Sequence, residues 1–269
     1  MAPKLISTSA AYDLIQNKRL VHILDTTYTL NNITPIENHF KHRLPTSQYL
    51  DVKNLSDSST GLTMTMPTQS HFIEFMRKLK VKNDDVPVLL YDHFNMTSPR
   101  AWFMFQVFGR KNVAVLDGGL SKWLKENLPI DSGKYNFNEV SDTSAGYEYV
   151  KNPGLLKGFE EVQQNLTEKK FQVLDARPAK VFNENKIQNS LNSPFDTLYN
   201  EDLTFKSPDQ LREHYARIGL DLSKEVVNSC RIGHSASVNL FALELIGKSS
   251  KLYDGSWEEW SKRHKPSST

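Results

Sequence analysis

The chain has 269 residues, and its 33 basic and 31 acidic side chains nearly cancel, which leaves a formal net charge of +2. Such a balance gives no strong electrostatic field, so neither nucleic acid nor an anionic membrane is expected as a partner. No apolar run approaches the roughly 20 residues that span a bilayer, and the amino terminus lacks the apolar core of a secretory signal. We therefore expect a soluble monomer in the cytoplasm, with the mitochondrion as the alternative compartment.

Cysteine and histidine usage argues against a metal site. Cys230 is the only cysteine, which excludes an internal disulfide, a CxxC redox pair and a thiolate zinc site. His39 and His42 form the closest histidine pair, but no third candidate ligand lies near them in the sequence, so both are interpreted as surface residues. Neither a metal ion nor a bound cofactor is expected.

The first half of the chain alternates apolar strands with helices. The periodicity predicts, in order, a capped helix at 9–15, a strand at 20–25, a helix at 71–80, a strand at 86–92, a helix at 100–108, a strand at 113–117 and a helix from 120 onward. Residues 26–67 form a polar stretch with few periodic segments. Alternation of this kind predicts an α/β fold, with a parallel sheet that carries helices on both faces.

The second half repeats the first. Three landmarks pair between the halves, namely Asp25 with Asp175, Asp92 with Cys230, and Asp117 with Asp254. Their offsets are 150, 138 and 137 positions, as one duplication followed by changes in loop length would leave. The sequence therefore predicts two similar domains, at 1–130 and 154–269, joined by a linker at 131–153. Because Asp92 replaces the cysteine in the first domain, only the second is equipped for thiol chemistry.

Cys230 begins the most informative stretch. A short strand ends just before it, an apolar helix is predicted over 236–246, and Gly247 stands where a helix usually stops. The six-residue loop between strand and helix can turn its backbone N–H groups toward one point, where the helix dipole adds positive potential. Such surroundings favour a thiolate over a thiol. The loop is therefore a predicted site for a negatively charged sulfur.

Several of these segments resemble the two-domain sulfurtransferases of the rhodanese and 3-mercaptopyruvate sulfurtransferase family, over nearly the whole chain. The most specific segments are Ser98-Pro99-Arg100-Ala101-Trp102, Leu116-Asp117-Gly118-Gly119-Leu120, Cys230-Arg231-Ile232-Gly233 and Tyr253-Asp254-Gly255-Ser256-Trp257. The resemblance implies two tandem rhodanese-like domains. It also implies that Cys230 takes a sulfane sulfur from a small anionic donor, holds it as a persulfide, and passes it to cyanide, a small thiol or a thioredoxin-like protein.

The resemblance also implies a set of substrate-binding residues around Cys230. Arg177, in the segment Asp175-Ala176-Arg177, matches the family arginine that binds the donor anion, and Asp175 is expected to orient it. The backbone of the loop would hold the outer sulfur. The full set is Arg177, Lys180, Arg231, Ile232, Gly233, His234 and Ser235, in which Lys180 stands in for a second family arginine that is Val181 here. His234 either modulates the sulfur or points into solvent.

Departures from the family pattern leave the donor open. Thiosulfate-type loops generally read Cys-Arg-Lys-Gly and mercaptopyruvate-type loops Cys-Gly-Ser-Gly; Arg231 agrees with the first and Ile232 with neither. Thiosulfate is the expected donor, with 3-mercaptopyruvate as the alternative. Replacing Ile232 with lysine is expected to raise thiosulfate use. The segment 186–192 also lacks the usual Gly-His-Ile-Pro-Gly.

Two other functions compete with sulfur transfer. A cysteine phosphatase uses Cys-x5-Arg, but Ala236 occupies the position of that arginine. The second rival is a catalytically silent binding or sulfur-sensing module that keeps the fold. The departures from the family pattern at Val181 and Ile232 favour this module. A sulfur adduct on Cys230 would separate this module from the enzyme.

Overall fold

The computed structural model describes residues 4–28, 34–134 and 142–264, which form two compact units. Unit 1 comprises residues 1–57, 67–152 and 200–205, and unit 2 comprises residues 58–66, 153–199 and 206–269. Each half of the chain thus lends one short segment to the unit built from the other half. The sequence pattern does not predict this exchange, because neither segment is periodic. Residues 135–141 of the expected linker lie outside the described residues.

Unit 1 contains five short strands and six α-helices among its described residues. They are β1 (Leu5–Ile6), α1 (Thr8–Gln16), β2 (His22–Asp25), α2 (Pro35–Lys41), β3 (Gln48–Tyr49), α3 (Val52–Leu55), α4 (Gln69–Leu79), β4 (Val88–Tyr91), α5 (Ser98–Val107), β5 (Val113–Leu116) and α6 (Gly119–Lys125). Of these helices, α1, α4, α5 and α6 are the ones that the sequence periodicity predicts.

Unit 2 has the same kind of order. It contains η1 (Ser58–Thr60), η2 (Pro153–Leu155), β6 (Leu156–Lys157), α7 (Phe159–Glu168), β7 (Phe171–Asp175), α8 (Ala179–Glu184), β8 (Leu191–Asn192), η3 (Phe195–Leu198), α9 (Pro208–Arg217), β9 (Glu225–Ser229), α10 (Ala236–Leu245), β10 (Lys251–Tyr253) and α11 (Ser256–Arg263).

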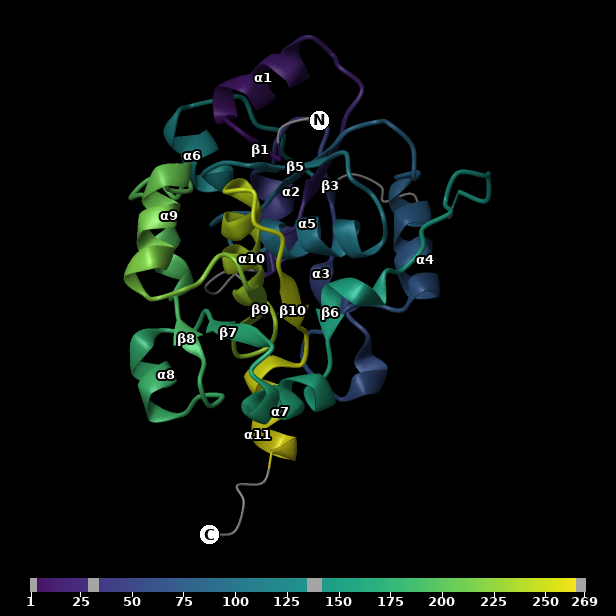
Figure 1. Ribbon diagram of the computed structural model, residues 1–269. Helices are drawn as coiled ribbons and strands as arrows, with labels where there is room; N and C mark the ends of the chain where they lie inside the picture. The colour runs from purple at the N-terminus through teal and green to yellow at the C-terminus, as the bar shows by residue number, and fades with distance from the viewer. Residues whose placement is uncertain (1–3, 29–33, 135–141, 265–269) are drawn as a thin grey trace. The chain divides into compact units, whose positions relative to one another are not determined.

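Both sheets have the same topology. Unit 1 has the strand order β1-β5-β4-β2-β3, and every neighbouring pair is parallel. Unit 2 has the order β6-β10-β9-β7-β8, again with every neighbouring pair parallel, and Figure 1 shows these five strands side by side. Strands that occupy equivalent places in the two sheets are those that the repeat predicted to match. Each unit is therefore an α/β domain with a parallel sheet and helices on both faces, and the predicted duplication is confirmed.

The two cores repeat as well. In unit 1, Trp123 from α6 is fully buried against residues of α1 and the sheet, and in unit 2, Trp260 from α11 is 3% exposed and packs with Phe159 and Tyr253. The two tryptophans stand six positions after Asp117 and Asp254 respectively. Large apolar side chains of this kind contribute roughly 1.5–3 kcal/mol each when buried, which fixes the last helix of each unit on its sheet.

The polar stretch 26–67 contains more secondary structure than its weak periodicity indicates, and the interpretation of His39 as a surface residue is wrong. It contains two α-helices and a strand, and α2 begins with a capping box in which Thr34 and Glu37 satisfy each other's backbone N–H groups, next to Pro35. That combination is a helix-start signal even where apolar periodicity is weak. His39 is also not a surface residue. It is fully buried, and its Nδ1 lies 2.8 Å from the Asp25 carboxylate.

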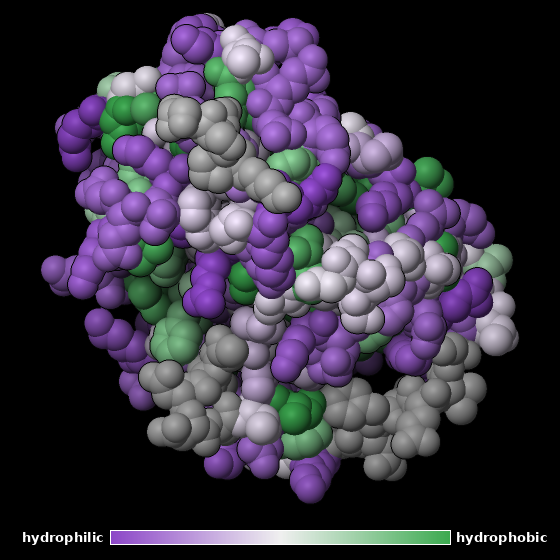
Figure 2. Space-filling model, turned by 90° about the horizontal axis from the view of Figure 1, so that it is seen from below, coloured by the Kyte–Doolittle hydropathy of each residue, from purple (hydrophilic) through white to green (hydrophobic). Residues whose placement is uncertain are grey.

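No helix within the described ranges is long and apolar enough to cross a membrane. Nor do the described residues contain a group of three or more His, Cys, Asp or Glu side chains placed to hold a metal ion. On the face shown in Figure 2, hydrophilic residues dominate, and hydrophobic residues appear as separate spots rather than as one continuous patch.

Candidate active site

Cys230 lies directly after the central strand β9 and before helix α10. Both elements are buried, since four of the five residues of β9 and the first eight residues of α10 are inaccessible to solvent, and α10 runs beside β9 and β10 (Figure 1). Gly233 turns the loop with a φ of +78°, in the left-handed region that glycine tolerates best. The loop is therefore fixed at both ends by core elements, as predicted for a rigid site.

The start of α11 holds the first residue of the loop. The backbone N–H of Cys230 donates to Ser256 Oγ at 3.2 Å, and Ser256 Oγ in turn donates to the Tyr253 carbonyl at 2.9 Å. Two further bonds run the other way, from Trp257 N–H to the Cys230 carbonyl at 2.9 Å and from Glu258 N–H to the Arg231 carbonyl at 2.8 Å. These contacts determine which way the peptide planes at the beginning of the loop face.

The equivalent loop of unit 1 shows what such a loop binds. Asp92, at the position of Cys230 in the repeat, is 2% exposed, and its carboxylate accepts four backbone N–H groups of its own loop. The donors are Phe94 at 2.8 Å, Met96 at 3.1 Å, Thr97 at 2.9 Å and Ser98 at 2.7 Å. This loop therefore closes around the two oxygens of one carboxylate, which lie two bonds beyond the Cβ of its first residue.

In the Cys230 loop, no protein group takes the place of that carboxylate. The repeat aligns Phe94 with Ile232 and Thr97 with Ser235, and the backbone N–H groups of Ile232 and Ser235 have no acceptor among the described residues. A thiol carries only one atom beyond Cβ and cannot reach the donors as a carboxylate does. A persulfide carries a second sulfur in nearly the position of an Asp carboxylate oxygen, and backbone donors of this kind stabilise an anion there.

Arg177 follows β7, the strand next to β9, and is only 3% exposed. Its Nε lies 3.0 Å from both oxygens of Asp175, and its Nη2 donates to Asp175 Oδ2 at 2.6 Å and to the Asn185 carbonyl at 2.7 Å. The Trp257 ring lies 4.6 Å from its guanidinium carbon. Among the described residues Nη1 has no hydrogen-bond partner, so one edge of a rigidly held cation remains available to an anion.

A pocket of about 390 Å³ connects Arg177 with the end of the Cys230 loop. Its lining is Arg177, Pro178, Val181, Glu184, Asn185, Arg231, Ser235 and Trp257. We call it the Arg177 pocket. Cys230 is 1% exposed and does not line it, so the thiol lies beneath the surface of the loop.

The predicted site residues separate into three groups. Arg177, Arg231 and Ser235 line the Arg177 pocket, whereas Ile232 lines a different pocket next to it. Gly233 forms the turn, and His234 is buried at 6% exposure, which excludes the solvent-pointing alternative for its side chain. Lys180 is exposed on α8 and is not among the residues of either pocket, so the structure does not bring it to the others.

Sequence reasoning missed two residues of this site. Ser256 and Trp257 were quoted only as part of a motif, yet one holds the Cys230 amide and the other stacks on Arg177. The repeat contained the signal for Ser256, because it aligns with Gly119, and a serine in place of a turn glycine indicates that its hydroxyl has a partner. No pattern in the sequence places Trp257 against Arg177.

Comparison with known proteins identifies the family. A model of the rhodanese-like domain matches residues 7–126 and again residues 159–263. The chain is a two-domain sulfurtransferase of the rhodanese family. It is 31% identical to thiosulfate sulfurtransferase of Rattus norvegicus over 282 residues, which covers 97% of this chain and 93% of that protein. It is 33% identical to 3-mercaptopyruvate sulfurtransferase of Mus musculus over 262 residues, with 91% and 86% covered.

Solved structures agree with this assignment. The crystal structure of SseA from Escherichia coli, a 3-mercaptopyruvate sulfotransferase described as having the rhodanese fold, is similar to this sulfurtransferase with a TM-score of 0.85 at 27% identity, and covers 95% of this chain and 99% of SseA. Tum1 from Saccharomyces cerevisiae gives the same TM-score at 25% identity. The relatives thus include proteins named for either of two sulfur donors.

Proposed function

We propose that this sulfurtransferase takes a sulfane sulfur from thiosulfate and transfers it to a thiophilic acceptor, cyanide or a thiol, through a persulfide on Cys230. One observation carries the proposal. In unit 1 the loop that follows Asp92 closes around its carboxylate, whereas in the equivalent loop of unit 2, which begins with a cysteine, the backbone N–H groups of Ile232 and Ser235 have no acceptor among the described residues. A second sulfur on Cys230 would fill the place of the missing anionic atom.

Loading of the enzyme needs no cofactor. The Cys230 thiolate attacks the outer sulfur of thiosulfate, a new S–S bond forms, and the bond inside thiosulfate breaks with its electron pair leaving on sulfite. Arg177 supplies the cation for the donor's oxygens through Nη1, since its other nitrogens are held by Asp175 and Asn185. A guanidinium fixed in this way binds an oxyanion without first losing rotamer freedom.

Discharge reverses the roles of the two sulfur atoms. The acceptor nucleophile attacks the outer sulfur, its new bond to sulfur forms, and the Cys230 Sγ–S bond breaks so that Cys230 leaves as a thiolate. The backbone donors of the loop stabilise negative charge on the outer sulfur before attack. With cyanide the product is thiocyanate, and with a thiol it is a persulfide.

The choice of thiosulfate as donor rests on charge. Arg177 and Arg231 both line the Arg177 pocket, and two cations suit a small dianion. Position 232 has the apolar side chain of isoleucine, which offers no hydroxyl to the carbonyl group of 3-mercaptopyruvate. 3-Mercaptopyruvate is the second candidate, because relatives named for that donor are as similar in sequence as those named for thiosulfate.

Intact mass after incubation with each donor tests the proposal. We expect one added sulfur on the wild-type protein with thiosulfate, removed by cyanide, and no addition to the Cys230→Ser variant. A larger yield from 3-mercaptopyruvate than from thiosulfate would favour the second candidate. No addition with either donor would refute the persulfide and favour a silent binding module.

A further inference from the structure

A second pocket adjoins the catalytic loop. It has a volume of about 600 Å³ and is lined by Thr63, Arg231, Ile232, Trp257, Glu258, Ser261 and Lys262. We call it the Lys262 pocket. It shares only Arg231 and Trp257 with the Arg177 pocket, and its other walls come from the segment 58–66 and from one side of α11. The loop that would carry the sulfur is thus reached from two pockets with different linings.

The acid in the Lys262 pocket already has partners. Glu258 accepts the Thr63 N–H at 2.9 Å and the Thr63 hydroxyl at 3.1 Å, and Lys262 Nζ lies 3.1 Å from its Oε1. The side chain of Glu258 is 19% exposed. Burial acts to raise the pKa of its carboxyl, but the bonds from Thr63 and Lys262 together outweigh burial and hold the pKa below its usual value. Its charge therefore remains, but it is shared among several donors.

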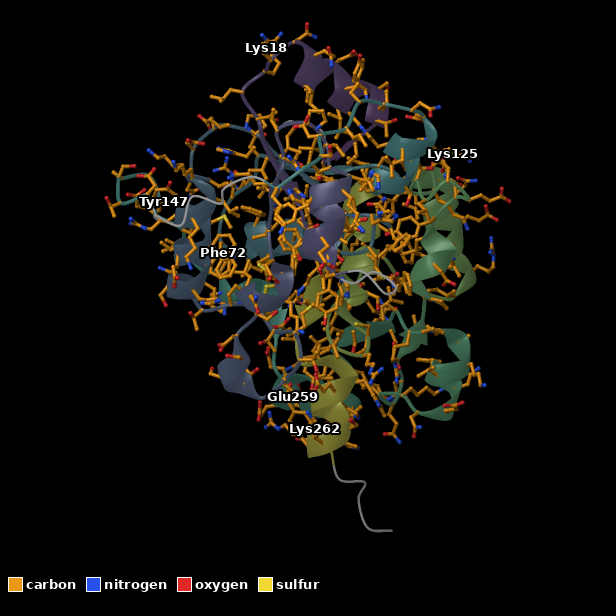
Figure 3. All side chains as sticks on the ribbon, turned by 180° about the vertical axis from the view of Figure 1, so that it is seen from behind. Lys18, Phe72, Lys125, Tyr147, Glu259 and Lys262 are labelled. Carbon is orange, nitrogen blue, oxygen red and sulfur yellow. The ribbon has the colours of Figure 1, made fainter. Side chains whose placement is uncertain are left out.

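The cations of this pocket are more accessible. Lys262 lies on the last turn of α11, near the carboxyl end of the described chain (Figure 3). Its side chain is 57% exposed. Arg231 is exposed, and its guanidinium has no partner among the described residues. Two basic side chains and one carboxylate that is already hydrogen-bonded thus line the pocket, and its excess positive charge suits a ligand with a carboxylate. Ile232 and Trp257 provide an apolar wall for a short carbon chain.

We propose that the Lys262 pocket binds the sulfur acceptor, and that Lys262 selects thiols that carry a carboxylate. This inference rests on the proposed function, because it assigns the second half-reaction to a pocket of its own. The acceptor thiol loses its proton to solvent, and its thiolate attacks the outer sulfur of the Cys230 persulfide. A new S–S bond forms, Cys230 leaves as a thiolate, and no further oxidant or reductant is needed.

Three thiols of similar size separate charge from chemistry. Mercaptoacetate is anionic, 2-mercaptoethanol is neutral and cysteamine is cationic. With the donor saturating, we expect Lys262→Glu to raise the KM for mercaptoacetate about fivefold, as loss of an exposed ion pair allows, to lower it for cysteamine, and to leave it nearly unchanged for 2-mercaptoethanol. Lys262→Gln should show a smaller change in the same direction for the anionic thiol.

Lys224→Glu is the matched control, because it makes the same change of charge just before β9, at the opposite end of the strand from Cys230. An equal effect from Lys224→Glu, or a shift in KM that is the same for all three thiols, would overturn the inference.

A binding measurement tests the Lys262 pocket independently of sulfur transfer. (Methylthio)acetate cannot accept sulfur, and its calorimetric affinity for the wild-type protein is expected to fall in Lys262→Glu and to persist in Lys224→Glu. If Cys230 never gains sulfur but this pattern of binding holds, the proposed function fails and the Lys262 pocket still stands as a site for a carboxylate. If Cys230 gains sulfur but the pattern is absent, only the acceptor pocket is refuted.

Discussion

The backbone N–H of Cys230 donates a hydrogen bond to the hydroxyl of Ser256 at 3.2 Å, and Ser256 itself has an unfavourable backbone conformation. Ser256 has a φ of +50° and is fully buried. Its counterpart in unit 1 is Gly119, with a φ of +59°, where an added Cβ would lie 2.4 Å from the Asp92 carbonyl oxygen. A side chain in this conformation is strained by roughly 1 kcal/mol or more, so unit 2 keeps a strained serine where unit 1 uses glycine.

The first prediction separates the strain at Ser256 from its hydrogen bond. Ser256→Ala and Ser256→Gly both remove the acceptor of the Cys230 N–H. We expect both to lower kcat for sulfur transfer by up to about tenfold, the rate equivalent of one ordinary hydrogen bond of roughly 1 kcal/mol. Because glycine relieves the strain and alanine does not, the glycine variant should be more stable than the alanine variant by about 1 kcal/mol. Denaturant unfolding and steady-state kinetics measure the two effects. If kcat is instead higher in Ser256→Gly than in Ser256→Ala, in step with their stabilities, the Ser256 hydroxyl has no role beyond folding.

The second prediction concerns where an added cation helps the donor. Val181 is 42% exposed and lines the Arg177 pocket, whereas Ile232 lines the Lys262 pocket. Val181→Arg is therefore expected to lower the KM for thiosulfate several-fold, roughly the effect of one additional partly exposed ion pair. Ile232→Lys, which the sequence suggested for the same purpose, should have the smaller effect on thiosulfate. Donor kinetics at a fixed cyanide concentration compare the two, and a larger gain from Ile232→Lys would place the donor in the other pocket.

The fold was predictable because its signals are local and occur twice. Strand β4 is a short run of buried apolar residues, and β9 contains the buried β-branched pair Val226 and Val227. Helices α5 and α10 follow these strands at the same spacing, and the repeat of Trp123 at Trp260 fixes the register of the last helix. Helix α2 was not predicted, because its signal is a capping box rather than an apolar stripe. The exchange of segments 58–66 and 200–205 is a tertiary effect that no local pattern records.

The parts of the site that are local in sequence were predictable, whereas the contacts between segments distant in sequence were not. Cys230, Ser235 and the turn at Gly233 follow from one loop, and the bond between Asp175 and Arg177 joins residues two positions apart. The division into two pockets depends on contacts between distant segments, such as Thr63 with Glu258, 195 positions away. Lys180 and Val181 are neighbours in sequence, and only the structure shows which of the two lines the Arg177 pocket.

The third prediction is a pH effect on stability at Asp117. Burial raises the pKa of this carboxyl from 3.8 to about 6, and the nearby Asp202 carboxylate acts in the same direction, although the Phe205 N–H that it accepts at 2.9 Å and Lys122 oppose the shift. Above pH 6 the folded protein carries a charge that the unfolded chain holds more easily. As pH falls from 6 toward 3.8 the folded carboxyl takes up its proton first and this penalty disappears.

Asp117→Asn removes the charge but keeps an oxygen for the Phe205 N–H. We expect it to raise the free energy of unfolding by about 1 kcal/mol at pH 7, a value reduced for the partial exposure of the group, and to have little effect near pH 4. Thermal unfolding at the two pH values measures the difference. A gain that is the same at both would mean that the effect comes from packing and not from ionisation.

The fourth prediction uses the first unit as a guide to the second. In Cys230→Asp the new carboxylate stands where Asp92 does in the repeat, and the N–H groups of Ile232 and Ser235 are available to it as those of Phe94 and Thr97 are to Asp92. Hydrogen bonds to a charged acceptor contribute roughly 1.5–3 kcal/mol each, and after the loss of solvation we expect a net gain of about 1 kcal/mol, or about 3 °C in Tm.

Cys230→Ala is the control for Cys230→Asp, because both abolish sulfur transfer and only the aspartate supplies an anion to the loop. Tm values from calorimetry should therefore rank Cys230→Asp above both the wild type and Cys230→Ala. The wild type loaded with sulfur should also melt higher than the unloaded protein, since the outer sulfur would fill the same place as the carboxylate. If Cys230→Asp is less stable than Cys230→Ala, the backbone donors of this loop do not converge on the atom beyond Cβ, and the persulfide is held in some other way.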